Sequence, residues 1–246
     1  MRLPSLSNLA ERARDVALRF PLVLVSALAA TVALFQFIDG PQPDWAMRLF
    51  YAGSLGIALF TAAALFGERF GPRAALAANL VSLATLVLLF AAVIGWRDPL
   101  VARRFVQLAL AFHLLVAVIP YLRGGESNGF WHYNKSLFMR FLTAALYSAV
   151  LFSGLSVALL ALDQLLGIRI SEGQYARLWF VVAFMFNTWF FLGGVPDDFQ
   201  KLDQSSDYPT GLKVFSQFIL VPIVTLYLVI LTVYLVKLAV TRVWPS

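Results

Sequence analysis

Four aspartates gather in one short polar stretch, and clustered carboxylates are the residues best able to hold a hard divalent cation. They are Asp197, Asp198, Asp203 and Asp207. Membrane transferases hold a diphosphate through magnesium with such aspartates, so the stretch is a candidate metal site. The spacing argues against it, because Asp198 lies too far back to share a helical face with Asp203 and Asp207. A solvated loop is the default interpretation.

A second polar stretch mixes aromatic rings with cations, a composition suited to lipid head groups. Its residues are Trp131, His132, Tyr133, Lys135 and Arg140. Aromatic rings settle at head-group depth while Lys and Arg contact phosphates, so an interfacial belt is one interpretation. The alternative is a specific pocket for a lipid head group or another anion. In that pocket the two cations would pair with Asp197 or Asp198 when no ligand is bound.

Polar side chains stand within the apolar stretches at eight positions: Asn79, Gln107, His113, Tyr147, Ser148, Asn187, Thr188 and Gln217. His113 is either a proton acceptor lining a cavity, since imidazole titrates near neutral pH, or a neutral ring hydrogen-bonded between helices. Asn187 and Gln217 favour hydrogen bonds between helices. Every acidic residue lies in a loop or at a helix end. This pattern counts against a proton- or sodium-coupled transporter, which usually places a carboxylate near the bilayer midplane.

The composition of the whole chain indicates a membrane protein. Hydrophobic residues make up 61% of the 246 and charged residues 13%, against roughly 45–50% and about 25% in soluble domains. The chain has no cysteine and only two histidines, which excludes disulfides and thiolate chemistry and disfavours a multi-histidine metal centre. The basic residues behind the net charge of +6 lie at helix ends, where they meet anionic lipid.

Apolar stretches of spanning length predict an all-α bundle of about seven transmembrane helices. The predicted spans are Pro21–Ile38, Ala46–Phe66, Ala74–Trp96, Phe105–Leu122, Phe141–Leu162, Tyr175–Gly193 and Val214–Val240. Short connections make consecutive helices antiparallel, which puts the two long connections, Arg123–Arg140 and Val195–Lys213, on the same side. Residues 1–20 place apolar and charged side chains on opposite helical faces. They predict an amphipathic helix that lies on the membrane surface or packs on the bundle.

Two further patterns concern orientation and packing. With the amino terminus in the cytoplasm, the cytoplasmic segments hold 11 of the 19 Lys and Arg residues, so we expect that orientation.

Small residues within the spans are expected where helices approach closely. They are Gly53, Gly56, Ser153, Gly154 and Ser156.

Three stretches of the second half carry a family resemblance. They read FWHYNKSLFMRFLTAALYSAVLFSGLSVALLALDQL, FVVAFMFNTWFFLGGVPDDFQKLDQ and YPTGLKVFSQFILVPIVTLYLVILTVYLVK. They resemble a bacterial inner-membrane family, domain of unknown function 4153, over residues 130–246 and more loosely over the first four spans. The resemblance implies a multi-pass protein of the bacterial inner membrane and carries over no catalytic residue. Members of the family are usually longer, so the end at Ser246 suggests a fragment, a truncation or a short relative.

These patterns predict three regions: an amphipathic helix over 1–20, a four-helix transmembrane segment over 21–122, and a three-helix segment over 123–246 with both long connections. Three functions stay open. The preferred one is a binding or scaffolding subunit of a membrane assembly, because it needs no residue that the sequence lacks. Its partners would be lipids and other membrane subunits, without nucleic acid, cofactor or catalysis. The alternatives are a permease-like transporter of a hydrophobic or lipid-like substrate and a magnesium-dependent membrane transferase.

Overall fold

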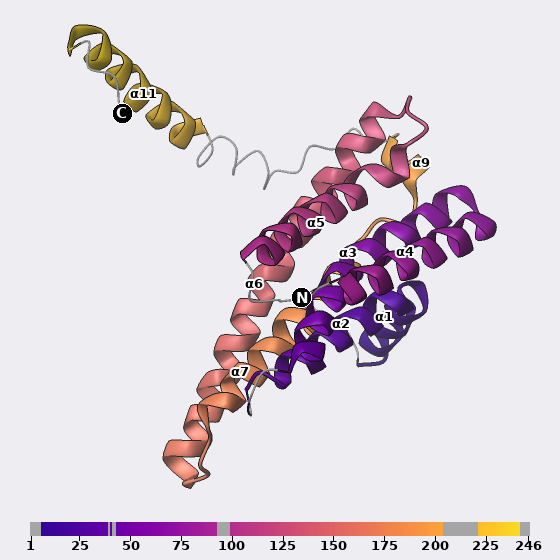
Figure 1. Cartoon of the computed structure of the whole chain (residues 1–246), viewed down its shortest axis with the longest axis vertical. Helices are drawn as coiled ribbons and strands as arrows, with labels where there is room; N and C mark the ends of the chain where they lie inside the picture. Colours follow the sequence, from indigo (N-terminus) through magenta and orange to yellow (C-terminus); the bar gives the residue numbers. More distant parts are fainter. Residues whose placement is uncertain (1–5, 39, 41–42, 93–98, 204–220, 242–246) are drawn as a thin grey trace. The chain divides into compact units, whose positions relative to one another are not determined.

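The computed structural model describes residues 6–38, 40, 43–92, 99–203 and 221–241, and every regular element in these ranges is helical (Figure 1). The chain divides into two units, Met1–Gln204 and Ser205–Ser246. The described part of the second unit is one apolar helix, α11 (Val221–Thr241). The predicted all-α class is confirmed, and the predicted span Val214–Val240 begins outside the described residues.

The chain enters the bundle through two helices that meet at a right angle. α1 (Leu6–Arg19) is followed by α2 (Pro21–Phe35), and the two are bent by 97°. Pro21 favours this start, because a first-turn proline lacks only an N–H that would have no helical partner. Val16 and Phe20 are buried beneath the bend. The amphipathic helix is therefore present and packs on the bundle, while its place on a membrane surface stays a prediction.

α3 (Asp44–Phe70) is the centre of the first unit, with α2, α4 (Pro72–Ala92) and α5 (Pro99–Val118) packed against it. Its small residues permit close approach: a Cβ added at Gly53 would lie 2.8 Å from the Ala30 backbone nitrogen. The helix ends at Gly71, whose φ of 98° reverses the chain into α4. The prediction of close contact at Gly53 is thus confirmed, whereas a Cβ at Gly154 would meet nothing within 4 Å.

The second half differs from the prediction where a long connection was expected. After the short 3₁₀ turn η1 (Ile119–Tyr121), α6 already begins at Ser127 and runs to Leu166. The prediction of a connection over Arg123–Arg140 is therefore wrong beyond Glu126. The mixture of charged and aromatic residues suggested a loop. The chain turns at Gly124 and Gly125, which both have positive φ. No glycine or proline after them in this stretch turns the chain again, so the helix continues.

The remaining helices return along α6 and end at the acidic stretch. They are α7 (Glu172–Phe180), the π-helical segment η2 (Val181–Phe186), α8 (Asn187–Leu192) and the short α9 (Phe199–Asp203). α7, η2 and α8 follow one another without a break and form one candidate span, Glu172–Leu192. A π-helical segment widens the turn by one residue and rotates every side chain that follows it.

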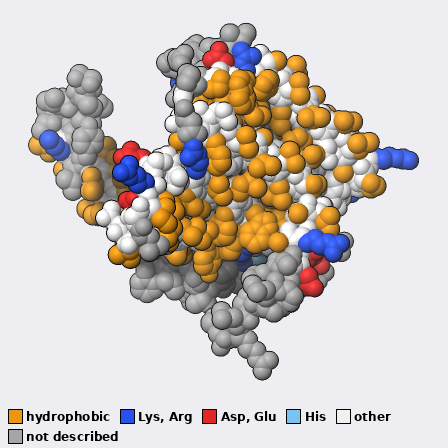
Figure 2. Space-filling view, turned by 90° about the horizontal axis from the view of Figure 1, so that it is seen from below, with side chains coloured by type: hydrophobic (Ala, Val, Ile, Leu, Met, Phe, Trp, Pro, Cys, Tyr) orange, Lys and Arg blue, Asp and Glu red, His pale blue; other side chains and the backbone are white. Residues whose placement is uncertain are grey.

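Five described helices are long and apolar enough to cross a membrane, or six if the bent pair α1–α2 counts as one span. The predicted number of about seven is thus not confirmed, partly because α2 alone has 15 residues, roughly 22 Å of helix against a hydrocarbon core of about 30 Å. Figure 2 shows a surface dominated by hydrophobic side chains, with charged groups towards its margins. The protein is a multi-pass membrane protein.

Candidate functional site

Arg19, at the end of α1, ties three distant segments together. Its Nε and Nη2 donate to Glu68 Oε1 and Oε2 at 2.7 and 2.9 Å, a two-pronged ion pair with the end of α3. Its Nη1 and Nη2 also donate to the carbonyls of Val195 and Pro196 at 2.7 and 2.9 Å. A second ion pair joins Arg69 to Glu126 before α6. The ends of α1, α3 and α8 and the start of α6 are therefore linked by charges at one end of the bundle.

A cavity of about 340 Å³ opens beside this network, and we call it the charged cleft. Its lining comprises Asp15, Val16, Arg19, Arg140, Trp189, Phe190, Leu192, Gly193 and Asp197. Two guanidinium groups and two carboxylates thus face one space, with an indole and a phenyl ring beside them. The cleft brings together the amphipathic first helix, α6 and the segment after α8.

Arg140 is held in the charged cleft by the end of α8. Its Nε donates to the Phe190 carbonyl at 3.0 Å, its Nη2 donates to the same oxygen, and its guanidinium carbon lies 4.1 Å from the centre of the Phe190 ring. The last carbonyls of a helix have no partner within it, so a guanidinium there satisfies one of them. A Cβ at Gly194 would lie 2.1 Å from Arg140 Nε, so a side chain at that position would displace the arginine.

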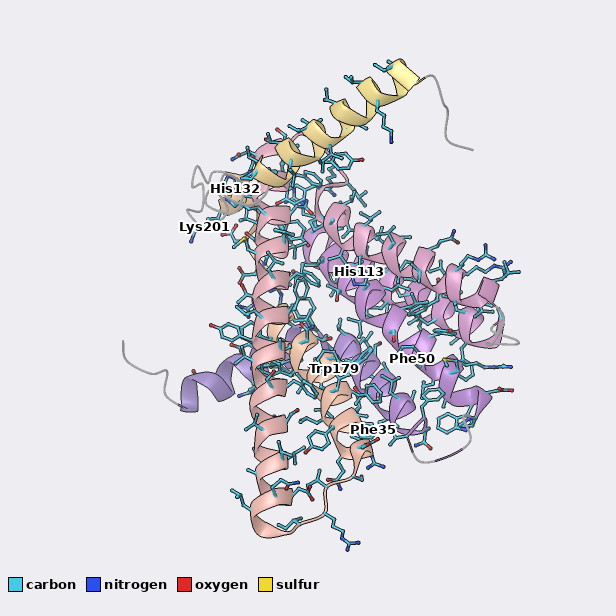
Figure 3. All side chains as sticks on the ribbon, turned by 90° about the vertical axis from the view of Figure 1, so that its left-hand side faces the viewer. Phe35, Phe50, His113, His132, Trp179 and Lys201 are labelled. Carbon is cyan, nitrogen blue, oxygen red and sulfur yellow. The ribbon has the colours of Figure 1, made fainter. Side chains whose placement is uncertain are left out.

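The other residues of the aromatic and cationic stretch do not share a pocket with Arg140. Because this stretch is helical, consecutive side chains point about 100° apart. Trp131 is 51% exposed, whereas Tyr133 is fully buried and donates its hydroxyl to the Val116 carbonyl at 3.1 Å. His132 is also buried, and its Nδ1 accepts a hydrogen bond from Lys135 Nζ at 2.7 Å. Figure 3 shows His132 and Lys201 at the same end of the molecule, where α6 and α9 adjoin.

Two of the described aspartates stabilise helix starts. Asp198 Oδ1 accepts from the Lys201 backbone N–H at 2.9 Å and caps α9. Asp203 Oδ1 accepts from the Gly129 N–H at 2.7 Å, in the first turn of α6. Asp197 lines the charged cleft, and Asp207 lies outside the described residues. Within the described ranges no group of three or more His, Asp or Glu side chains is placed to hold a metal ion.

Asp203 gives a first testable prediction. Asp203→Ala removes the acceptor for the Gly129 N–H, and a lost helix cap costs about 1 kcal/mol. Thermal unfolding of the detergent-solubilised protein should show a lower melting temperature. Asp197→Ala is the matched control, because its carboxylate has no hydrogen bond or ion pair with any described residue. An equal loss in both variants would contradict the capping role.

A second cavity, of about 430 Å³, lies between α3, α5, α6 and α8, and we call it the intramembrane groove. It is lined by Ile57, Ala58, Thr61, His113, Val116, Ala117, Asn134, Leu137, Phe138, Phe141, Asn187, Thr188, Phe191 and Leu192. His113 and Asn187, two of the polar residues singled out in the sequence, therefore meet here. Figure 3 labels His113 on α5, well away from His132 at the start of α6.

The remaining intramembrane polar residues lie elsewhere. Gln107 is exposed on α5, and Asn79 lines a separate cavity between α2, α3 and α4. Gln217 lies outside the described residues. His113 Nδ1 bonds to the Ala109 carbonyl of its own helix at 2.7 Å, and no bond to a described residue of another helix is present.

Two features of these sites were not predicted from the sequence. The Arg19–Glu68 pair joins residues 49 positions apart, which no local pattern reveals. Gly194 drew no prediction from the sequence, although its lack of a side chain gives room to Arg140.

Comparison with known proteins gives one finding. The model of a family described as domain of unknown function (DUF4153) matches residues 11–246. The comparisons with curated proteins and with solved structures gave no significant match. The match covers nearly the whole chain, including the first four predicted spans, over which the sequence resemblance was looser. This multi-pass membrane protein therefore belongs to the DUF4153 family.

Proposed function

We propose that the chain is a binding or scaffolding subunit of a membrane assembly that holds a zwitterionic phospholipid by its head group in the charged cleft. The observation that carries the proposal is the presence of two arginines and two aspartates around one cavity. The aspartate-based metal chemistry of a transferase has less support, because Asp198 and Asp203 cap helices.

The arginines supply the phosphate side of the site. A guanidinium group binds phosphate through parallel N–H donors, with more directional selectivity than an ammonium group. Arg19 and Arg140 are already fixed by backbone carbonyls of Val195, Pro196 and Phe190. Little side-chain freedom is therefore left to lose on binding, which favours affinity.

The aspartates supply the amine side. Asp15 and Asp197 have no hydrogen bond or ion pair with other described residues, so their carboxylates have acceptor capacity for an ammonium group. Two positive and two negative side chains leave the lining near neutrality. Such a lining suits a phosphate joined to an amine, as in phosphoethanolamine, better than a head group that is only anionic.

The surroundings of the cleft support a membrane–water boundary. α1 leaves the first apolar helix at 97°, the geometry expected of a helix lying along the surface beside one that crosses. Trp189 lines the cleft, and indole rings favour head-group depth. Phospholipid head groups are abundant at this depth, so a suitable ligand is present where the cleft opens.

Native mass spectrometry of the purified protein with phosphatidylethanolamine and phosphatidylglycerol tests the proposal. Wild type should retain phosphatidylethanolamine preferentially, and Arg140→Gln should weaken retention of both lipids by roughly ten-fold, the effect of losing a charge-assisted hydrogen bond. Asp15→Asn with Asp197→Asn should remove the preference between the two lipids. The same spectra would reveal any copurifying membrane subunit.

Arg123→Gln is the matched control. Arg123 lies at the same end of the molecule, stacked 4.8 Å from the centre of the Phe70 ring, but outside the cleft lining. It should leave lipid retention unchanged. Equal retention by wild type, Arg140→Gln and Arg123→Gln would refute a head-group site in the charged cleft.

A further inference from the structure

The intramembrane groove carries an inference that is independent of the charged cleft. None of the described residues in its lining is charged, and most of them are aliphatic or aromatic. Cavities of this size, mainly apolar with a few converging polar groups, are typical ligand sites. A charged ligand would lose its hydration in the groove without gaining an ionic partner, so an uncharged one is favoured.

His113 offers the groove a hydrogen-bond acceptor. Its Nδ1 lies 2.7 Å from the Ala109 carbonyl oxygen. A carbonyl oxygen only accepts, so Nδ1 must carry the proton, and in the neutral ring Nε2 carries a lone pair. No other described residue bonds to His113. In hydrocarbon no water is at hand to satisfy that lone pair.

Thr188 differs from the other threonines whose side chains are described in how its hydroxyl is hydrogen-bonded. Each of the other threonines whose side chains are described donates to the carbonyl four residues earlier: Thr31, Thr61, Thr85, Thr143, Thr225 and Thr232. This is the usual way to satisfy a hydroxyl inside a membrane helix. Thr188 makes no such bond to a described residue. Its fourth preceding residue lies in the π-helical segment η2, where the backbone bonds skip to the fifth residue.

Asn187 adds a third polar group beside Thr188. Its amide has no hydrogen-bond partner among the described residues, and it lines the same groove. π-Helical segments occur frequently at functional sites, because they re-aim the side chains around them. Here η2 ends at the point where two polar residues enter the groove. The groove thus combines an acceptor on α5 with an amide and a hydroxyl on α8.

We propose that the intramembrane groove binds an uncharged, mostly apolar lipid that ends in a hydroxyl group. The ligand hydroxyl donates to His113 Nε2 and accepts from both the Asn187 amide and the Thr188 hydroxyl. Its chain packs against Leu137, Phe138 and Phe141. An isoprenoid alcohol and a quinol share this chemistry. No covalent step is involved.

Photolabelling of the intact protein in detergent tests this site. The probe is a long-chain alcohol bearing a diazirine, and its methyl ether, which has no O–H to donate, is the matched ligand control. The alcohol should label the peptides of α3, α5 and α6 around the groove more strongly than the ether. His113→Phe, Asn187→Leu and Thr188→Val each replace a polar side chain with an apolar one, and Thr188→Val also keeps the side-chain volume. Each should lower alcohol labelling by roughly three- to ten-fold, the effect of one lost hydrogen bond.

Gln107→Leu is the matched protein control, because it removes a polar residue from the same helix outside the groove. It should leave labelling unchanged. Competition by an unlabelled isoprenoid alcohol or by a short-chain ubiquinol identifies the source of the hydroxyl, and either result supports the proposal. Equal labelling by alcohol and ether, competition by neither lipid, or adducts confined to other helices would overturn it. Loss of lipid binding at the charged cleft would not affect these readouts.

Discussion

Replacing Arg19 with leucine is expected to lower the free energy of unfolding of the detergent-solubilised protein by about 3 kcal/mol. The substitution removes four hydrogen bonds, two to Glu68 and two to the carbonyls of Val195 and Pro196. It also leaves the Glu68 carboxylate, 30% exposed, without its partner. This loss is smaller than the cost of breaking a fully buried ion pair, because water still reaches both side chains.

Two companion variants separate the ion pair from the carbonyl bonds. Arg19→Leu combined with Glu68→Leu leaves no unpaired charge, so its cost should be smaller than the sum of the single costs. Exchanging the charges, Arg19→Glu with Glu68→Arg, should recover only part of the stability, since the bonds to Val195 and Pro196 stay lost. Arg123→Leu is the arginine control and should change stability little. Melting curves that rank Arg123→Leu with Arg19→Leu would contradict the role of the network.

The sequence was sufficient to predict the helices, but not the residues at which all of them begin and end. Spanning length and short turns predicted α3, α4 and α5, because apolar runs and glycine or proline at helix ends are local signals. The start of α6 at Ser127 was missed for a physical reason. Asn134 and Ser136 look like loop residues, yet within the helix they donate to the carbonyls four positions earlier, so polar composition alone did not break it.

The candidate sites were predictable as residues but not as groupings. The stretch from Trp131 to Arg140 was treated as one surface, and the helix distributes its side chains in different directions. Arg140 instead lines the charged cleft together with Asp15, a residue far away in the sequence. His113 and Asn187 are both recognisable as polar residues in apolar runs, but their common groove depends on how α5 and α8 pack. The register shift at η2 depends on backbone hydrogen bonds that residue types do not specify.

The contact between α2 and α3 leads to the second large expected effect. A Cβ at Gly53 would lie 2.8 Å from the Ala30 nitrogen, 2.9 Å from the Ser26 carbonyl oxygen and 3.2 Å from the Ala30 Cα. All three atoms belong to the backbone of α2, so no side-chain rotation relieves the clash. Helix association in membranes depends on such close packing rather than on the hydrophobic effect.

Gly53→Ala is therefore expected to lower the free energy of unfolding by about 3 kcal/mol, because α2 must move away from α3 along their shared surface. Gly56→Ala should cost less, since its Cβ would meet side-chain atoms of Ser26 and Leu86 that can shift. Gly154→Ala is the control with open space around it, and alanine there should leave stability unchanged or raise it slightly, given its better helix propensity. Melting temperatures in one detergent would order the three variants. If Gly154→Ala were as unstable as Gly53→Ala, the loss would come from the helix backbone and not from the α2–α3 contact.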